Sequence, residues 1–186
     1  MSLAIALLAA GGATRFGGGK LDADCAGKPL GRWALEAALA VPHERLAVVV
    51  ANPVPEFASG CELLVNERAA EGLGTSAALA ARWAAGSDAL LIILADMPLV
   101  STETLRQLVA ADGPSAVTYP GGKPGAPACF PAALFPALEA LSGDSGAAQV
   151  LRGLPGVTLI ETPPGDLRDV DRPEDLAEVA AILRAR

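Results

Sequence analysis

Short apolar segments that alternate with longer amphipathic ones are the feature that most constrains the fold of this chain. Residues 90–94 (Leu-Leu-Ile-Ile-Leu) are apolar at every position, which is typical of a strand buried on both faces of a parallel sheet. Because such a sheet needs helices as crossover connections, we expect an α/β fold: a three-layer α/β/α sandwich with a mostly parallel, Rossmann-like sheet. The predicted strands are 3–9, 46–51, 62–65, 89–95, 116–119, 126–130 and 157–160.

Helical periodicity fills most of the segments between these strands. Ser101 or Thr102 can cap a helix that ends near residue 111, and Asp171, followed by Pro173, is the expected N-cap of the last helix. The Gly- and Pro-rich residues 119–127 are expected to form a loop on the substrate side. A length of 186 residues suits a single domain over residues 1–186. The other predicted helices are 32–40, 76–85, 131–141 and 144–152.

Composition disfavours several classes of function. A formal net charge of −7 and a pI of about 4.7 argue against nucleic-acid binding, because an acidic chain repels phosphates. The single histidine, His43, rules out a histidine-rich metal site, and the three cysteines form no CxxC pair, which argues against a disulfide framework or structural zinc. No signal peptide and no apolar run of about 20 residues is evident. The chain is therefore expected to be cytoplasmic and to make no membrane contact.

The strongest chemical signal follows the first predicted strand, where residues 8–20 read Leu-Ala-Ala-Gly-Gly-Ala-Thr-Arg-Phe-Gly-Gly-Gly-Lys. Glycines let backbone N–H groups approach an anion closely, and Arg15 and Lys20 supply the positive charge that a polyphosphate needs. The alternative is an ordinary flexible turn with two solvated cations. The segment is not a P-loop, because Thr14 and Leu21 occupy two of its defining positions, and it lacks the GxGxxG dinucleotide motif.

Two acidic positions could serve a metal ion. Asp96 follows the buried strand at 89–95, where the crevice above an α/β sheet binds ligands, although a turn or capping role would also account for it. Asp169 is either a second metal ligand or an ion-pair partner of Arg168 or Arg172. Mg²⁺ commonly takes one or two protein carboxylates and completes its shell with water and phosphate oxygens.

Four motifs in a fixed order carry a family resemblance: LAAGxxxRFGxxK, NxxxxEGLGTS, LADMPLVSTETL and DVDRPEDL. Together they span residues 8–176 and resemble the molybdenum cofactor nucleotidyltransferase family, with its cytidylyl-transferring members nearest. The resemblance implies the nucleotide-diphospho-sugar transferase type of fold. It also implies Mg²⁺-dependent transfer of CMP from CTP to the terminal phosphate of molybdopterin, with release of pyrophosphate. A transient contact with a molybdoenzyme or its chaperone would follow from that role.

The resemblance also assigns roles to matching positions. Arg15 and Lys20 match the cations that bind the triphosphate, and Asp96 matches the magnesium ligand; these three are the expected catalytic residues. Asp169 matches a position facing the reaction centre and is the second expected metal ligand, with Asp171 as the alternative. The expected nucleotide-binding residues are Leu8, Ala9, Ala10, Gly11, Gly12, Arg15, Lys20, Asn66, Gly72 and Ser76.

Departures from the family pattern bear on both substrates. Ala10 and residues 72–76 differ from guanylyl-transferring relatives, which favours CTP over GTP. Residues 142–149 lack the arginines that suit a pterin phosphate, and Ala126 stands where a histidine is common. Three other cations could take over the binding of the acceptor: Lys123, Arg152 and Arg168.

Two other functions stay open at the level of sequence. A sugar- or polyol-phosphate nucleotidyltransferase would use the same nucleotide-binding segment. A non-catalytic protein that delivers molybdopterin belongs to another class, and the combination of Arg15, Lys20 and Asp96 disfavours it. A phosphate nucleophile needs no general base, which suits a chain with one histidine.

Overall fold

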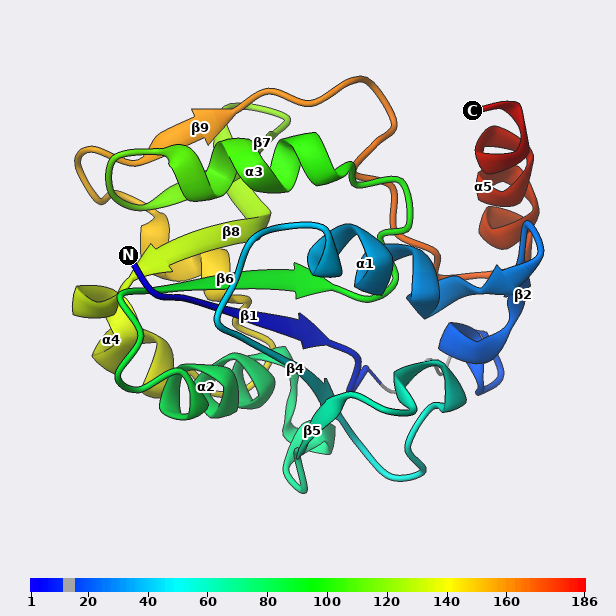
Figure 1. The fold of residues 1–186 in the computed structure, drawn as a ribbon, viewed down its shortest axis with the longest axis horizontal. Helices are drawn as coiled ribbons and strands as arrows, with labels where there is room; N and C mark the ends of the chain where they lie inside the picture. Colours follow the sequence, from blue (N-terminus) through cyan, green and yellow to red (C-terminus); the bar gives the residue numbers. More distant parts are fainter. Residues whose placement is uncertain (12–15) are drawn as a thin grey trace.

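The computed structural model describes residues 1–11 and 16–186, and its centre is a seven-stranded sheet of order β5-β4-β1-β6-β8-β7-β9 (Figure 1). Within this sheet β8 alone runs antiparallel to its neighbours. The mostly parallel sheet and all seven predicted strands are thus confirmed. The strands are β1 (Leu3–Leu8), β4 (Arg45–Val50), β5 (Glu62–Val65), β6 (Ala89–Leu94), β7 (Ser115–Tyr119), β8 (Lys123–Pro131) and β9 (Thr158–Ile160).

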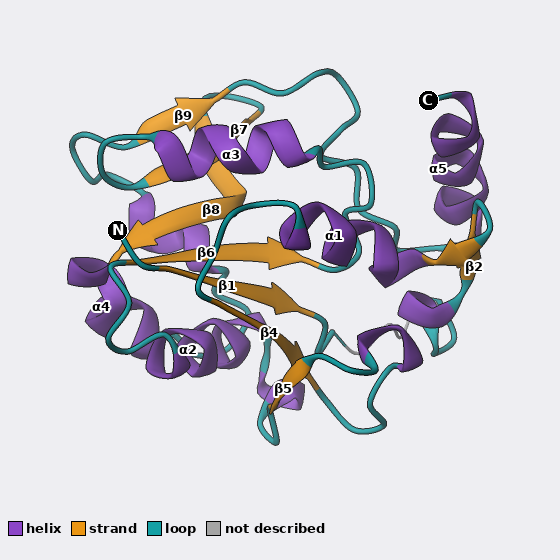
Figure 2. Cartoon of the chain, in the orientation of Figure 1, coloured by secondary structure: helices purple, strands orange, loops and turns teal. Residues whose placement is uncertain are grey.

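Helices cover both faces of the sheet and complete the expected three layers (Figure 2). Helices α1 (Leu30–Leu39) and α3 (Thr102–Ala110) pack on one face, and α2 (Leu73–Trp83) and α4 (Phe135–Glu139) pack on the other. Helix α5 (Pro173–Ala185) lies beside the small hairpin of β2 (Asp24–Cys25) and β3 (Lys28–Pro29). No described helix is long and apolar enough to cross a membrane.

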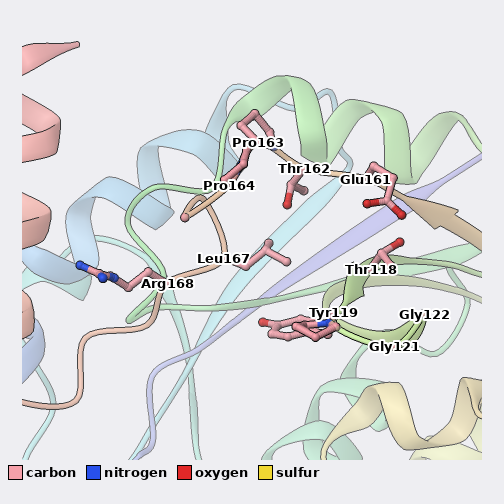
Figure 3. A pocket seen from close by; sticks show the side chains of 12 residues that line it. Thr118, Tyr119, Gly121, Gly122, Glu161, Thr162, Pro163, Pro164, Leu167 and Arg168 are labelled. Atoms are coloured by element: carbon pink, nitrogen blue, oxygen red, sulfur yellow. The ribbon is translucent and has the colours of Figure 1, made fainter.

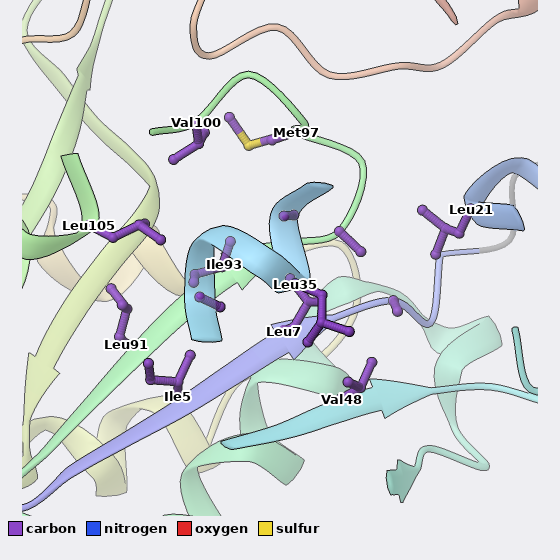
Figure 4. Close-up of a cluster of buried hydrophobic side chains, with 14 of the residues drawn as sticks. Ile5, Leu7, Leu21, Leu35, Val48, Leu91, Ile93, Met97, Val100 and Leu105 are labelled. Carbon is purple, nitrogen blue, oxygen red and sulfur yellow. The ribbon is translucent and has the colours of Figure 1, made fainter. Parts of the chain in front are cut away.

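The alternation of side chains along β1 explains why this strand is apolar throughout. Ile5 and Leu7 belong to the cluster under α1 and α3, whereas Ala4 and Ala6 belong to the cluster under α2. Figure 4 shows Leu7 beside Leu35 of α1 and Ile5 near Leu91 of β6. Each face of a covered strand is buried, so both sets of alternating positions must be apolar.

Two predicted segments adopt a different structure. The helix expected at 144–152 is a short 3-10 helix, η5 (Ala147–Leu151), because Gly143, with a φ of 60°, and Gly146 interrupt any longer helix. The loop expected at 119–127 is the turn of the β7–β8 hairpin plus the first half of β8. The helix expected at 131–141 is shorter than predicted, a 3-10 turn followed by α4.

The N-termini of α3 and α5 are capped in different ways. Ser101 caps α3 as expected, accepting a hydrogen bond from Thr104 N at 3.1 Å. The prediction that Asp171 caps α5 is wrong: Arg172 occupies that position. Asp175 reaches back from the first turn, and its Oδ2 accepts from the backbone N of Arg172 (2.8 Å) and of Asp171 (3.1 Å). The Asp171 carboxylate instead lies 3.6 Å from the Lys20 ammonium.

Candidate active site

Lys20 lies at the carboxyl edge of the sheet and directly follows three consecutive glycines in the sequence. Residues 17–19 have positive φ angles of 88°, 98° and 63°, a region that residues with a side chain adopt only with strain. This turn places Lys20 at the start of the 3-10 helix η1 (Lys20–Asp22), with 9% of its side chain exposed. Its ammonium lies 2.8 Å from Asp96 Oδ2 and 3.6 Å from Asp171 Oδ1. The sequence-predicted pair of Lys20 and Asp96 is therefore brought together.

The end of β1 and the glycine turn enclose a cavity of about 270 Å³, which we call the glycine-loop cavity. Ala9, Gly11 and Lys20 line it, whereas Leu8 faces a different cavity described below. Gly12 and Arg15 lie outside the described residues, so their roles stay predictions. The remaining lining residues are Gly18, Gly19, Leu21, Asp22, Ala51, Pro53, Val54 and Pro55.

A backbone hydrogen bond joins the two acidic segments of the site. Val170 N donates to Asp96 O at 3.0 Å, and the Val170 side chain is fully buried. Because Val170 points into the core, the flanking Asp169 and Asp171 keep their carboxylates at the site. Lys20 therefore faces carboxylates from two segments that are far apart in the sequence.

Partial burial and the neighbouring carboxylates raise the pKa of Asp169. Asp169 is surface-exposed, yet partial desolvation raises the pKa of its carboxyl, and the negative charges of Asp171 and Asp96 raise it further. Lys20 opposes this effect by favouring the ionised form. A bound cation would relieve the same repulsion.

The oxygen donors fit a magnesium ion. Among the residues described, no group of three or more His, Cys, Asp or Glu side chains is arranged to hold a metal. Mg²⁺ does not need such a group, because one or two carboxylates, water and substrate phosphates complete its shell. Asp96 and Asp169 would supply the protein ligands, because the hydrogen bond from Val170 N to Asp96 O brings their two segments together.

The expected nucleotide-binding residues Asn66 and Ser76 form a buried network beneath the start of α2. Asn66 Nδ2 donates to Thr75 Oγ1 and to Ser76 Oγ, both at 2.9 Å. Asn66 is 6% exposed and Ser76 is 2% exposed, so these side chains hold the end of α2 in place. The part of α2 that this network holds is therefore its N-terminal start. Asn66 and Ser76 do not line the glycine-loop cavity, and their contact with a nucleotide stays a prediction.

Gly72 is required by close packing. Its φ of 119° already favours glycine, and a Cβ there would lie 2.3 Å from the carbonyl of Gly143. Gly74 N donates to the same carbonyl at 2.9 Å. The GLG motif therefore docks α2 against the loop that precedes η5.

Two further cavities meet at Tyr119, at the end of β7. The first, of about 380 Å³, lies between the β7–β8 hairpin and η5, and Lys123 and Arg152 supply its positive charge; we call it the hairpin cavity. The second, of about 680 Å³, lies between the end of β7 and the loop after β9; we call it the β9-loop cavity. Burial raises the pKa of Tyr119, and the charges of Asp169 and Asp96 add to this, so Tyr119 adjoins the acidic site.

Sequence reasoning missed two features of this site. It assigned Asp171 chiefly to a helix cap, although the Asp-x-Asp spacing with Asp169 was a signal that both could face Lys20. It did not single out Tyr119, whose position at a strand end next to a glycine-rich turn was the available signal. Of the three candidate cations for an acceptor, Arg168 is instead paired with Glu178 of α5.

A mostly parallel α/β sheet with a buried lysine and clustered carboxylates at its carboxyl edge is the arrangement expected of a nucleotide-binding transferase. Comparison with known proteins then identifies the family: residues 5–159 match the MobA-like NTP transferase domain. The chain belongs to this family and is a nucleotidyltransferase.

A curated relative agrees with this family, and two solved structures agree with its fold. The purine catabolism protein PucB of Bacillus subtilis is 32% identical, with 90% of this chain and 91% of PucB covered. A nucleotidyl transferase from Methanothermobacter thermautotrophicus superposes with a TM-score of 0.82 at 23% identity, covering 100% of this chain and 99% of the other. CMP-2-keto-3-deoxy-manno-octonic acid synthetase, solved with CTP, has a TM-score of 0.73 at 15% identity, covering 100% and 99%, and shows the fold alone.

Proposed function

We propose that this protein is a Mg²⁺-dependent cytidylyltransferase that transfers CMP from CTP to the terminal phosphate of molybdopterin or molybdenum cofactor and releases pyrophosphate. The observation that carries the proposal is the Lys20 ammonium, almost buried and held 2.8 Å from Asp96 at the edge of the glycine-loop cavity. An ammonium with a defined position can stabilise charge that develops on phosphate oxygens without reorganising.

The acceptor, the cations and the metal each have a distinct role in the transfer of CMP. The acceptor phosphate attacks the α-phosphorus of CTP, the bond from that phosphorus to the bridging oxygen breaks, and the electron pair leaves with pyrophosphate. Lys20, together with Arg15, would stabilise the negative charge that builds on the leaving group. Asp96 and Asp169 would hold Mg²⁺, which when bound supplies charge neutralisation at the phosphates.

The choice of CTP rests on sequence departures and is compatible with the structure. Ala10 and residues 72–76 differ from the pattern of guanylyl-transferring relatives. The fold itself accommodates CTP in CMP-2-keto-3-deoxy-manno-octonic acid synthetase, which supports the proposal without deciding between nucleotides.

An anionic acceptor fits the hairpin cavity. Lys123 and Arg152 line it together with the amide of Gln149, while Leu73, Ile92 and other apolar residues form its walls. This combination suits a flat ring system that carries a phosphate. Lys123 and Arg152 would thus replace the arginines missing from residues 142–149.

Pyrophosphate release measures the proposed reaction directly. The protein is incubated with Mg²⁺, one of CTP, GTP, UTP or ATP, and either molybdopterin or a panel of sugar and polyol phosphates. We expect release with CTP and molybdopterin, a loss of at least tenfold in Arg152→Gln, and no loss in the matched surface variant Arg106→Gln. Release only with a sugar or polyol phosphate would establish the alternative transferase.

A thermal-shift panel tests the remaining alternative, a carrier of molybdopterin. CTP with Mg²⁺ should raise the unfolding temperature more than GTP or UTP does. Stabilisation by molybdopterin but by no nucleotide would favour the carrier and contradict the proposal.

A further inference from the structure

Two cavities at the carboxyl edge of the sheet lie between segments that follow paired strands, and their walls are held in different ways. The walls of the β9-loop cavity follow β7 and β9 (Figure 3). On one wall Tyr119 donates to Ala126 O, which lies outside this cavity. On the other, Arg168 donates to Glu178 of α5, again outside it. The walls of the glycine-loop cavity follow β1 and β4, and here the side chain of Asp22 joins one wall to the segment that continues the other.

The hydrogen bonds of the sheet do not reach across the glycine-loop cavity. Strands β1 and β4 pair as far as Leu8 and Val49, and Ala9 N donates to Val49 O at 2.7 Å. Beyond this point one wall is formed by residues 18–22 and the opposite wall by residues 51 and 53–55. A contact outside the sheet must therefore set the position of Lys20 relative to the opposite wall.

Asp22 makes such a contact with two hydrogen bonds. Its Oδ2 accepts from Glu56 N at 2.9 Å, and its Oδ1 accepts from Phe57 N at 2.8 Å. Both N–H groups belong to the 3-10 helix η2 (Glu56–Ala58), whose N-cap residue, Pro55, supplies no side-chain acceptor. The first N–H groups of a helix have no partner within the helix. Asp22 therefore does from a distance what a capping side chain normally does locally.

Both ends of this contact are fixed to the hydrophobic core. Phe57 is 4% exposed, and a Cβ on Gly31 of α1 would lie 2.7 Å from its ring, so the ring packs directly on the helix backbone. On the other side Leu21, which stands between Lys20 and Asp22, is buried in the same cluster (Figure 4). The turn that carries Lys20 is therefore joined to α1 through two buried side chains and one carboxylate.

We infer that Asp22 is a positioning residue for Lys20: its carboxylate ties η1 to η2, and this contact fixes the Lys20 ammonium at the glycine-loop cavity. A negative charge on the wall of a polyphosphate site repels the substrate, so the charge of Asp22 does not account for its presence, whereas its two hydrogen bonds do. The effect on turnover rests on the proposed function, in which Lys20 stabilises the leaving pyrophosphate. Misplacement of a group by about 1 Å can lower turnover about a hundredfold.

Acetylation of lysines by sulfosuccinimidyl acetate, followed by mass spectrometry of the peptides, tests the contact without any substrate. The Lys20 side chain is 9% exposed in the intact site. We expect its amino group to react about fivefold faster, or more, in Asp22→Ala than in wild type, because the turn that carries it can then open locally. Lys28 and Lys123 serve as internal standards and should keep their rates.

Two comparisons separate the hydrogen bonds from the charge and from any carboxylate. Asp22→Asn removes the same charge but keeps one acceptor oxygen, so the rate at Lys20 should rise only about twofold. Asp88→Ala removes a carboxylate that accepts from Ser2 N at 2.6 Å, at the amino edge of the sheet, and should leave the rate at Lys20 unchanged. An unchanged rate in Asp22→Ala, or equal rates in Asp22→Ala and Asp22→Asn, would overturn the inference.

Glu56 allows the contact to be broken from its other end, with Asp22 intact, should Asp22→Ala fail to fold. Glu56→Pro removes one of the two N–H donors at the first position of η2, where proline is tolerated. Glu56→Ala removes the same exposed side chain and keeps the N–H group. We expect acetylation of Lys20 to accelerate about twofold in Glu56→Pro and to stay unchanged in Glu56→Ala. Equal rates in these two variants would overturn the inference.

Pyrophosphate release tests whether Asp22 acts through Lys20. The kcat of Asp22→Ala should fall about tenfold, with the KM for the acceptor unchanged. In a Lys20→Met background the same substitution should change kcat by less than about twofold, because a positioning residue has no effect once the ammonium is absent. An equal loss in both backgrounds would mean that Asp22 has only a structural role and would overturn the inference.

Failure of this inference and failure of the proposed function give different results. Faster acetylation of Lys20 in Asp22→Ala and Glu56→Pro, in a protein that releases no pyrophosphate, would support the positioning of Lys20 and remove the proposed function. Wild-type pyrophosphate release and wild-type acetylation in Asp22→Ala would remove the inference and leave the proposed function in place.

Discussion

Replacement of Lys20 by methionine probes the electrostatic basis of the site. Methionine keeps a similar length and removes the charge that lies 2.8 Å from Asp96 and 3.6 Å from Asp171. Loss of one preorganised donor to a developing negative charge typically costs about 10²-fold in turnover, which corresponds to about 2.7 kcal/mol of transition-state stabilisation. We expect kcat for pyrophosphate release to fall about a hundredfold, and a tenfold fall is the smallest that the assignment allows.

The assay needs a control for charge alone. Lys28→Met removes an ammonium that pairs with Glu36 on a more exposed part of the surface, and its activity should stay within twofold of wild type. Activity of Lys20→Met within threefold of wild type would refute the assignment of Lys20 to the leaving group.

The pH dependence of stability supplies a second readout in metal-free buffer. In Lys20→Met the carboxylates of Asp96, Asp169 and Asp171 lose their shared cation, so the pKa of Asp169, already raised, should rise further. A carboxyl whose pKa is higher folded than unfolded destabilises the protein when ionised, and protonation relieves this. The stability deficit of the variant should therefore shrink as the pH falls toward about 4, while activity should not recover. A deficit that grows on acidification would contradict this reasoning.

Three further predictions concern individual residues. Asp169→Asn removes an ionised group with a raised pKa, so in metal-free buffer it should raise the unfolding temperature at pH 7, with a gain that disappears at low pH, while lowering turnover. Gly72→Ala should cost about 2–4 kcal/mol by chemical denaturation, because backbone strain adds to the collision with Gly143. Gly86→Ala, also at positive φ but with open space around it, should cost about 1 kcal/mol; equal costs would argue against the collision. Burial raises the pKa of Cys129 to about 12, so a thiol reagent should modify it only at the rate of unfolding; rapid modification of the native protein would contradict its burial.

The sheet could be predicted from sequence because burial on both faces leaves a local signature. β1 and β6 are apolar at nearly every position, and both were located to within one residue. The prediction of a helix at 144–152 was wrong for the opposite reason. Its apolar residues suit any buried turn, and Gly146 prevents a longer helix. Asp171 was misassigned because the Asp175 carboxylate, one turn later, supplies the cap.

The site could be predicted only in part, since its geometry depends on distant segments. Two strand-end motifs predicted Lys20 and Asp96 as separate site residues, whereas their ion pair is seen only in the structure. The cavity between β7 and the loop after β9 depends on the pairing of these two strands, and no local pattern reports which strands become neighbours. The convergence of Lys123 and Arg152 on one cavity depends in the same way on the packing of η5 against β8.

Transfer of a labelled phosphorus atom tests the central claim most directly. The protein is incubated with Mg²⁺, molybdopterin and CTP labelled at the α-phosphorus, and the products are separated. The proposed function predicts that the label enters a cytidylylated acceptor in a one-to-one ratio with released pyrophosphate, and that Lys20→Met slows both about a hundredfold. Label recovered only as CTP or free CMP, with the molybdopterin unmodified, would contradict it.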